Sequence, residues 1–160
     1  MIRVPFTKLA GAGNDFVLID TLRDPLRELE PRWRLVAKTL CDRRRGIGAD
    51  GLLVLGRSRA ATIRMRIFNP DGSEPSMCGN GIRCLAWYAN RRGVAPRRLS
   101  IETKAGIKRA QVLRRGQVRI DMGAPRLERA EIPMLGGPGH VIAEPLRAAD
   151  RDLSVTCVSM

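Results

Sequence analysis

The stretch MCGNGIRCLAWYANRRG, residues 77–93, predicts a helix that lies inside the molecule. Apolar residues recur at the three- and four-residue spacing of one helix face. We expect the helix to run from about Cys78 to Arg92 and to end at Gly93, because glycine is common just past a helix C-terminus. A helix that is apolar on most sides is buried by its neighbours. The main face consists of Ile82, Leu85, Ala86 and Ala89, and Cys84, Trp87 and Tyr88 add apolar surface around it.

Short strands are predicted on both sides of this helix in the sequence. The clearest is Thr62–Asn69, where Ile63, Met65 and Ile67 alternate with arginines, the period-two pattern of a half-buried strand. Turns rich in glycine, asparagine and aspartate separate the strands. The other expected strands are Arg3–Leu9, Phe16–Leu22, Leu52–Leu55, Arg98–Lys104, Ile107–Leu113 and Gln117–Met122.

A mixed α/β domain of the α+β type is therefore expected over residues 1–122. A first helix follows Pro31 and ends near Arg45, with basic residues in its last turn, where the helix dipole favours them. The region after Gly123 is rich in proline and glycine. We expect residues 123–160 to form a connector and the first strand of a second domain, at Ser154–Met160.

The net charge of +13 comes mainly from arginine and raises the question of nucleic-acid binding. The arginines are scattered and often stand at turns, and the aromatic residues are not interleaved with them as in a stacking surface. We therefore expect no nucleic-acid partner but a solvated basic surface that attracts anionic metabolites. No stretch approaches the ~20 apolar residues of a membrane span, and the first residues lack the features of a signal peptide. These patterns predict a cytoplasmic protein with no membrane partner.

The four cysteines do not suggest a metal site or a disulfide framework. No two of them form a CxxC pair, and the one histidine, His140, is far from all of them in sequence. We expect no metal. Cys41, Cys84 and Cys157 stand in apolar patterns and are predicted to be core residues.

The segment Gly46-Ile47-Gly48-Ala49-Asp50-Gly51 matches the dinucleotide-binding pattern G-x-G-x-x-G. That pattern needs a strand before it and a helix after it. Here a predicted helix precedes it and a predicted strand follows. We interpret the segment as a glycine-rich turn from helix to strand, with no cofactor.

Cys78 stands where the buried helix begins, followed by glycine and asparagine. Free N–H groups and the positive end of the helix dipole converge at such a position. This environment favours the thiolate form of a cysteine, and the same N–H groups can bind a carboxylate. On these grounds alone, a small buried hydrophobic residue at a helix start is an equal alternative.

Several blocks of the sequence, in the same order, resemble the signature segments of the diaminopimelate epimerase family. Any one block is weak, whereas their order over almost the whole chain is specific. The blocks are Gly11–Phe16, Leu40–Arg44 with Gly46–Gly51, Phe68–Glu74, Met77–Cys84, Glu102–Gly106 and Asp121–Pro125.

The resemblance implies a pseudo-symmetric fold of two similar halves, each a mixed, mainly antiparallel sheet wrapped around a central helix. It implies that Cys78 is one of two thiols that move the α-proton of the substrate. The side chains of Asn14 and Asn69, and the backbone N–H groups of Gly79 and Asn80, are implied to bind the substrate.

The implied reaction interconverts LL- and meso-diaminopimelate, a dicarboxylic amino acid of lysine and cell-wall precursor synthesis, without a cofactor. Two opposed thiols are needed because a stereocentre is inverted by removing a proton from one face and adding one to the other. The resemblance also implies a homodimer. Because the expected second thiol does not occur in these residues, we expect an N-terminal fragment that is inactive alone. The alternatives are a non-catalytic remnant of the family and a proline racemase-like isomerase.

Overall fold

The computed structural model describes residues 3–22 and 26–160. The chain divides into two compact units, Met1–Asp121 and Met122–Met160, which are described separately.

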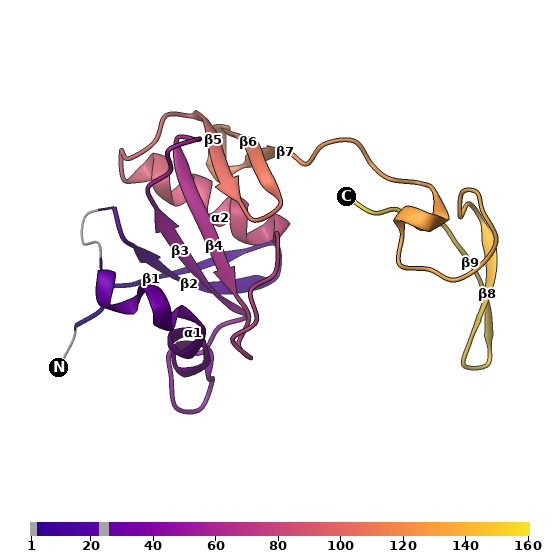
Figure 1. Cartoon of the computed structure of the whole chain (residues 1–160), viewed down its shortest axis with the longest axis horizontal. Coiled ribbons are helices and arrows are strands. Elements are labelled where there is room, and N and C mark those ends of the chain that lie inside the picture. Colours follow the sequence, from indigo (N-terminus) through magenta and orange to yellow (C-terminus); the bar gives the residue numbers. More distant parts are fainter. Residues whose placement is uncertain (1–2, 23–25) are drawn as a thin grey trace. The chain divides into compact units, whose positions relative to one another are not determined.

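The first unit is built on one seven-stranded sheet with the strands in chain order, β1 to β7 (Figure 1). Neighbouring strands are antiparallel except at β2–β3 and β4–β5, which are parallel. The predicted mixed, mainly antiparallel sheet is therefore confirmed. The strands are β1 (Thr7–Gly11), β2 (Asn14–Asp20), β3 (Gly51–Gly56), β4 (Ile63–Phe68), β5 (Arg98–Thr103), β6 (Gly106–Val112) and β7 (Val118–Asp121).

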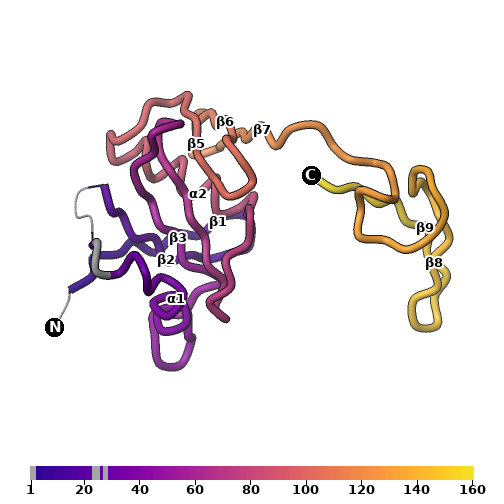
Figure 2. Tube along the Cα trace, in the orientation of Figure 1, coloured from indigo at the N-terminus to yellow at the C-terminus, as the bar shows by residue number. Residues whose placement is uncertain are grey.

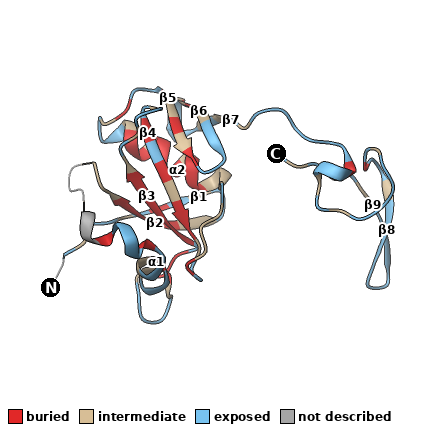
Figure 3. Cartoon of the chain, viewed as in Figure 1, coloured by how far each residue is buried: buried red, intermediate tan, exposed pale blue. Residues whose placement is uncertain are grey.

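Helix α2 (Gly79–Arg91) packs on one side of this sheet. It contacts β1 and β2 as well as β6 and β7, so the sheet curls and both of its ends reach the helix. Ile82, Leu85 and Ala86 are fully buried against Leu53 and neighbouring strand residues in one apolar cluster. Figure 3 shows this burial along α2, β3 and β4. Removing such side chains from water is the main force that holds the helix in place.

Helix α1 (Trp33–Cys41) follows a short 3₁₀ helix, η1 (Arg27–Arg32), and packs with a second apolar cluster. Trp33, Ala37 and Cys41 of α1 are buried there with Val17 of β2 and Leu52 of β3. Side chains alternate between the two faces of a strand, so α1 and α2 use alternate residues of β2 and β3.

The prediction that α1 extends to Arg45 is wrong. The helix ends at Cys41 because the Asp42 carboxylate accepts hydrogen bonds from the N–H groups of Arg44 (2.7 Å) and Arg45 (3.0 Å). The chain then folds back, and the N–H groups of Ile47 and Gly48 donate to the carbonyl of Leu40. These bonds close the helix end and turn the chain toward β3.

The second unit contains a 3₁₀ turn, η3 (Arg129–Glu131), and a hairpin of β8 (Glu144–Ala148) and β9 (Arg151–Val155) (Figure 2). The sequence reading missed β8 and placed the last strand at Ser154–Met160, several residues too late. Cys157 follows β9 and is only half-buried, so its prediction as a core residue is wrong. None of the helices in the described residues has the length and apolar run that crossing a bilayer requires.

Candidate functional site

Cys78 is the N-cap residue of α2. Its backbone is extended (φ −145°, ψ 115°), and its carbonyl accepts the hydrogen bond of the Ile82 N–H at 2.9 Å. Its Sγ accepts a hydrogen bond from the N–H of Gly81 at 3.3 Å. The thiol is half-buried and lies against the edge of the α2 cluster. The sulfur therefore lies at the positive end of a helix, on a residue that is half-buried.

The backbone beside this sulfur is open to a ligand. The first N–H groups of a helix have no acceptor within the helix. Among the described residues, the N–H groups of Gly79 and Asn80 donate to no protein atom. A methyl group built on Gly79 would meet no atom within 4 Å. A carboxylate could approach the two N–H groups from this space.

Asn14 and Asn80 are brought together, as the resemblance implied for parts of one site. Asn14 is the first residue of β2, after a β1–β2 turn in which Ala12 and Gly13 have φ of 52° and 89°. Nδ2 of Asn80 donates to Oδ1 of Asn14 at 2.7 Å and to the carbonyl of Ala12 at 3.3 Å. The β1–β2 turn is thereby tied to the start of α2, two residues after Cys78.

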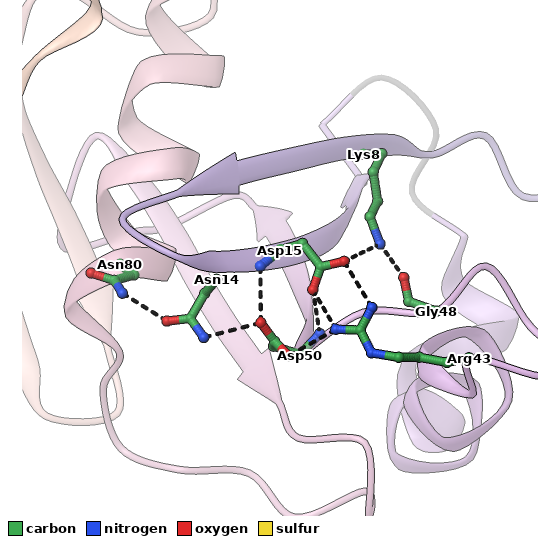
Figure 4. Close-up of polar contacts among 7 residues, drawn as sticks. All are labelled: Lys8, Asn14, Asp15, Arg43, Gly48, Asp50 and Asn80. Atoms are coloured by element: carbon green, nitrogen blue, oxygen red, sulfur yellow. Dashed lines mark hydrogen bonds and ion pairs between the residues drawn. The ribbon is translucent and has the colours of Figure 1, made fainter.

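A network of charged side chains continues from Asn14 (Figure 4). Nδ2 of Asn14 donates to Asp50 Oδ2 at 3.0 Å. Arg43 joins two carboxylates, because its NH2 lies 2.9 Å from Asp50 Oδ1 and 2.7 Å from Asp15 Oδ1. Lys8 also pairs with Asp15, at 2.8 Å.

The two carboxylates of this network are held ionised. The hydrogen bond from Arg43, with a further one from Lys8, keeps the pKa of Asp15 well below its ordinary value. The hydrogen bond from Asn14 lowers the pKa of Asp50. The sequence patterns did not predict this network, although Asp15, Arg43 and Asp50 all stand in the quoted signature blocks.

Asn69 lies at the end of β4 and begins a segment, residues 69–78, that leads to Cys78. Its Nδ2 donates to Ser73 Oγ at 2.9 Å, and its N–H to the Ser73 carbonyl at 2.8 Å. Among the described residues, no hydrogen bond joins Asn69 to Asn14, Asn80 or Cys78. A hydrogen bond thus joins Asn14 to Asn80, whereas Asn69 is connected to Cys78 along the backbone of segment 69–78.

Between Asn69 and Cys78, the segment 69–78 is anchored to the sheet. Arg66 of β4 binds the Glu74 carboxylate through Nε at 2.7 Å and through NH2 at 3.2 Å. The N–H of Ala105 donates to the Ser76 carbonyl at 3.2 Å. Two-pronged guanidinium–carboxylate pairs fix geometry well, so the approach of the chain to Cys78 is restrained.

The other cysteines of the first unit are unlike Cys78. Burial raises the pKa of Cys41 to about 11 and also raises the pKa of Cys84. Both are buried in the apolar clusters, as predicted. The glycine-rich segment Gly46–Gly51 is the predicted turn between helix and strand, since α1 precedes it and β3 follows.

A broad groove of about 950 Å³ lies between β1, α2 and β7. Lys8, Arg83, Trp87 and Arg119 are among the residues that line it, and Cys78 is not. The groove therefore does not coincide with the candidate site.

Two solved structures with this fold are described as a probable proline racemase and a hydroxyproline epimerase. A probable proline racemase from Agrobacterium radiobacter K84 matches with a TM-score of 0.61 and 17% identity, over 92% of this chain and 46% of that one. A hydroxyproline epimerase from Agrobacterium vitis matches with a TM-score of 0.60 and 18% identity, over 89% and 44%. The chain therefore has the fold of about half of each of these two molecules.

Sequence comparison identifies the family. The family model described as diaminopimelate epimerase matches residues 6–128. The diaminopimelate epimerase of Desulforudis audaxviator is 55% identical over 159 residues, and that of Pelotomaculum thermopropionicum is 48% identical over 160. This chain belongs to the diaminopimelate epimerase family. The matches include 97% of this chain but only about 56% of the length of each of these two relatives.

Proposed function

We propose that this chain supplies one side of an active site that interconverts LL- and meso-diaminopimelate by proton transfer between two thiols. The observation that carries the proposal is the position of Cys78. Its sulfur caps α2 beside the N–H groups of Gly79 and Asn80, in a chain of the diaminopimelate epimerase family. A base and a carboxylate-binding site are thus adjacent.

The chemistry needs a base that can take the α-proton of the substrate. The Cys78 thiolate takes the α-proton from one face of the substrate and becomes a thiol, which leaves an electron pair on the α-carbon. A second thiol gives its proton to the opposite face and becomes a thiolate, so that the stereocentre is inverted. Hydrogen-bond donors at the substrate carboxylate stabilise the charge that develops between these two steps.

The second thiol must come from outside the first unit. Cys41 and Cys84 are buried in the apolar clusters, and burial raises the pKa of both, which disfavours the thiolate form. Cys157 follows β9 in the second unit rather than beginning a helix. We propose that the partner thiol lies in the part of the relatives that this chain does not match.

The substrate-binding roles are those that the family resemblance implies. We assign the N–H groups of Gly79 and Asn80 to the carboxylate next to the reacting carbon, because both are unpaired and the space beside Gly79 is open. Asn14 and Asn69 are assigned to the remaining polar groups of the substrate. The proposed setting is lysine and cell-wall precursor synthesis in the cytoplasm, with no cofactor and with a homodimer as the complete enzyme.

The test is activity in a complete two-sided site. A fused protein is made in which this chain replaces the matching 56% of the Desulforudis audaxviator relative. It is incubated with LL-diaminopimelate in D₂O, and mass spectrometry and chiral chromatography follow deuterium at the α-carbon and formation of the meso isomer. The 160-residue chain alone serves as control.

We expect the fused protein to epimerise diaminopimelate with deuterium incorporation, and the chain alone to do neither. A folded but inactive fused protein would favour the alternative of a non-catalytic remnant. Turnover of proline in place of diaminopimelate would favour a proline racemase-like isomerase. Either result would overturn the proposal.

A further inference from the structure

Both the nitrogen and the oxygen of the Asn14 side-chain amide form hydrogen bonds within the protein (Figure 4). Nδ2 donates to Asp50 at 3.0 Å, and Oδ1 accepts from Asn80 at 2.7 Å. If the amide turned over, its NH₂ group would face the NH₂ group of Asn80, and its oxygen would face a carboxylate. An amide has distinct donor and acceptor ends, so one orientation is fixed.

Asp50 is itself held from two directions. Its Oδ2 accepts the backbone N–H of Asp15 at 3.0 Å, and its Oδ1 accepts from Arg43 at 2.9 Å. The parallel pairing of Phe16 with Gly51 brings Asp15 next to Asp50. An ionised carboxylate can only accept hydrogen bonds, so Asp50 selects the NH₂ end of Asn14.

The Asn80 side chain has no donor left for a ligand. Its Nδ2 donates to Asn14 and to the Ala12 carbonyl, and its Oδ1 accepts from Arg83. The NH₂ group of Asn14 has two N–H bonds, and within the described part of the chain Asp50 takes one of them. The second N–H of Asn14 is left for a ligand.

We propose that Asp50 is a positioning residue of this site. It fixes the Asn14 amide so that the second N–H of Asn14 donates to an oxygen of the ligand, and a carboxylate supplies such an oxygen. The identity of the ligand rests on the proposed function, whereas the positioning of Asn14 by Asp50 does not.

Asp42→Ala is a matched control for Asp50→Ala. Both residues lie between α1 and β3, and both carboxylates accept backbone N–H groups. Asp42 accepts those of Arg44 and Arg45, and within the described residues it makes no hydrogen bond to Asn14. If the substitutions only destabilise the loop, Asp50→Ala and Asp42→Ala should behave alike. If Asp50 orients Asn14, only Asp50→Ala should change the Asn14 amide.

The first measurement is NMR of the side-chain amide of Asn14 in the ¹⁵N-labelled chain, with its signals assigned from Asn14→Ala. We expect Asp50→Ala to shift both N–H signals and to speed their exchange with solvent about tenfold, because one hydrogen bond is lost. Asp42→Ala should leave the signals in place. Unchanged Asn14 signals in Asp50→Ala would overturn the proposal.

The second measurement is kinetics of the fused protein. Asp50→Ala should raise KM for diaminopimelate about tenfold and change kcat less than about threefold, because the contact serves binding. Asp50→Glu, which keeps the charge, should recover part of this loss. A KM that stays unchanged while the melting temperature falls as in Asp42→Ala would overturn the proposal. If the unsubstituted fused protein is inactive, the proposed function fails, and the NMR result still decides the role of Asp50.

Discussion

Replacing Gly79 with alanine should stabilise the fold and weaken the site. Gly79 is the first residue of α2, and its φ lies outside the left-handed region. Alanine is the better helix former and restricts the unfolded chain. A methyl group at this position would meet no atom within 4 Å, so no clash offsets the gain. We expect about 0.5 kcal/mol of added stability and a melting temperature about 2 °C higher.

The same methyl group should occupy the space through which a carboxylate reaches the N–H groups of Gly79 and Asn80. Loss of one hydrogen bond to a charged group costs about 2 kcal/mol, which corresponds to roughly a thirtyfold higher KM. The assays are thermal unfolding of the chain by circular dichroism and diaminopimelate kinetics of the fused protein.

Gly81→Ala is the control for this prediction. Its methyl group would lie 3.0 Å from Leu53 Cδ2 and 3.4 Å from Ile67 Cδ1. Overpacking of this kind costs about 1–3 kcal/mol, so this variant should melt at a lower temperature. A Gly79→Ala variant that melts as low as Gly81→Ala, or that leaves KM unchanged, would contradict this prediction.

Three further predictions follow from the same geometry. Iodoacetamide at pH 8 should label Cys78 well before Cys41 and Cys84, because burial raises the pKa of both buried thiols, to about 11 for Cys41. Peptide mass spectrometry measures the labelling rate of each cysteine, and equal rates would contradict this prediction. Gly46→Ala should cost about 3 kcal/mol or more of unfolding free energy in a urea titration, since its methyl group would lie 2.2 Å from the Thr39 carbonyl oxygen; a loss under 1 kcal/mol would refute the clash. The lowered pKa of Asp15 stabilises the fold above the unfolded aspartate pKa of about 3.9, and this stabilisation is lost as pH falls through the lower folded value. Arg43→Gln should therefore flatten the decline of melting temperature between pH 5 and pH 2, and an unchanged slope would be evidence against it.

The parts of the fold that follow from local pattern were predictable. The spacing of Ile82, Leu85 and Ala89 located α2, and glycine after its last turn marked its end. Alternation predicted a strand over Thr62–Asn69, and β4 spans Ile63–Phe68. These elements bury a regular set of side chains, so their periodicity survives in the sequence.

The network behind Asn14 could not be derived from such patterns. Asp15 and Asp50 are far apart in sequence, and they meet because β2 and β3 pair in parallel with Phe16 opposite Gly51. The pairing of one strand with another leaves no periodic pattern of residues in the sequence, so this register could not be predicted. The end of α1 was misjudged because the Asp42 carboxylate stops the helix before a basic run that suits a helix C-terminus. In the second unit, β8 and β9 are mostly exposed, so their residues do not show the alternation of apolar and polar side chains that marks a half-buried strand.

The family resemblance supplied what local physics left undecided at Cys78. Residue chemistry alone allowed either a reactive thiol or a small buried side chain. The structure places Cys78 at the helix start with its sulfur hydrogen-bonded to Gly81, and the residue is half-buried; its role as a reactive thiol stays a prediction. The roles of Asn14, Asn69, Gly79 and Asn80 stay predictions until ligand binding is measured.

The most direct test of the account is the turnover number of the fused protein with Cys78→Ala, compared with Cys157→Ala. Removing an acid–base group of this kind costs on the order of 10²–10⁴ in rate, so Cys78→Ala should lose at least about a hundredfold in kcat. Cys157→Ala should stay within about twofold of the parent. If Cys78→Ala keeps kcat within about threefold of the parent, this sulfur does not move the substrate proton, and the central claim is wrong.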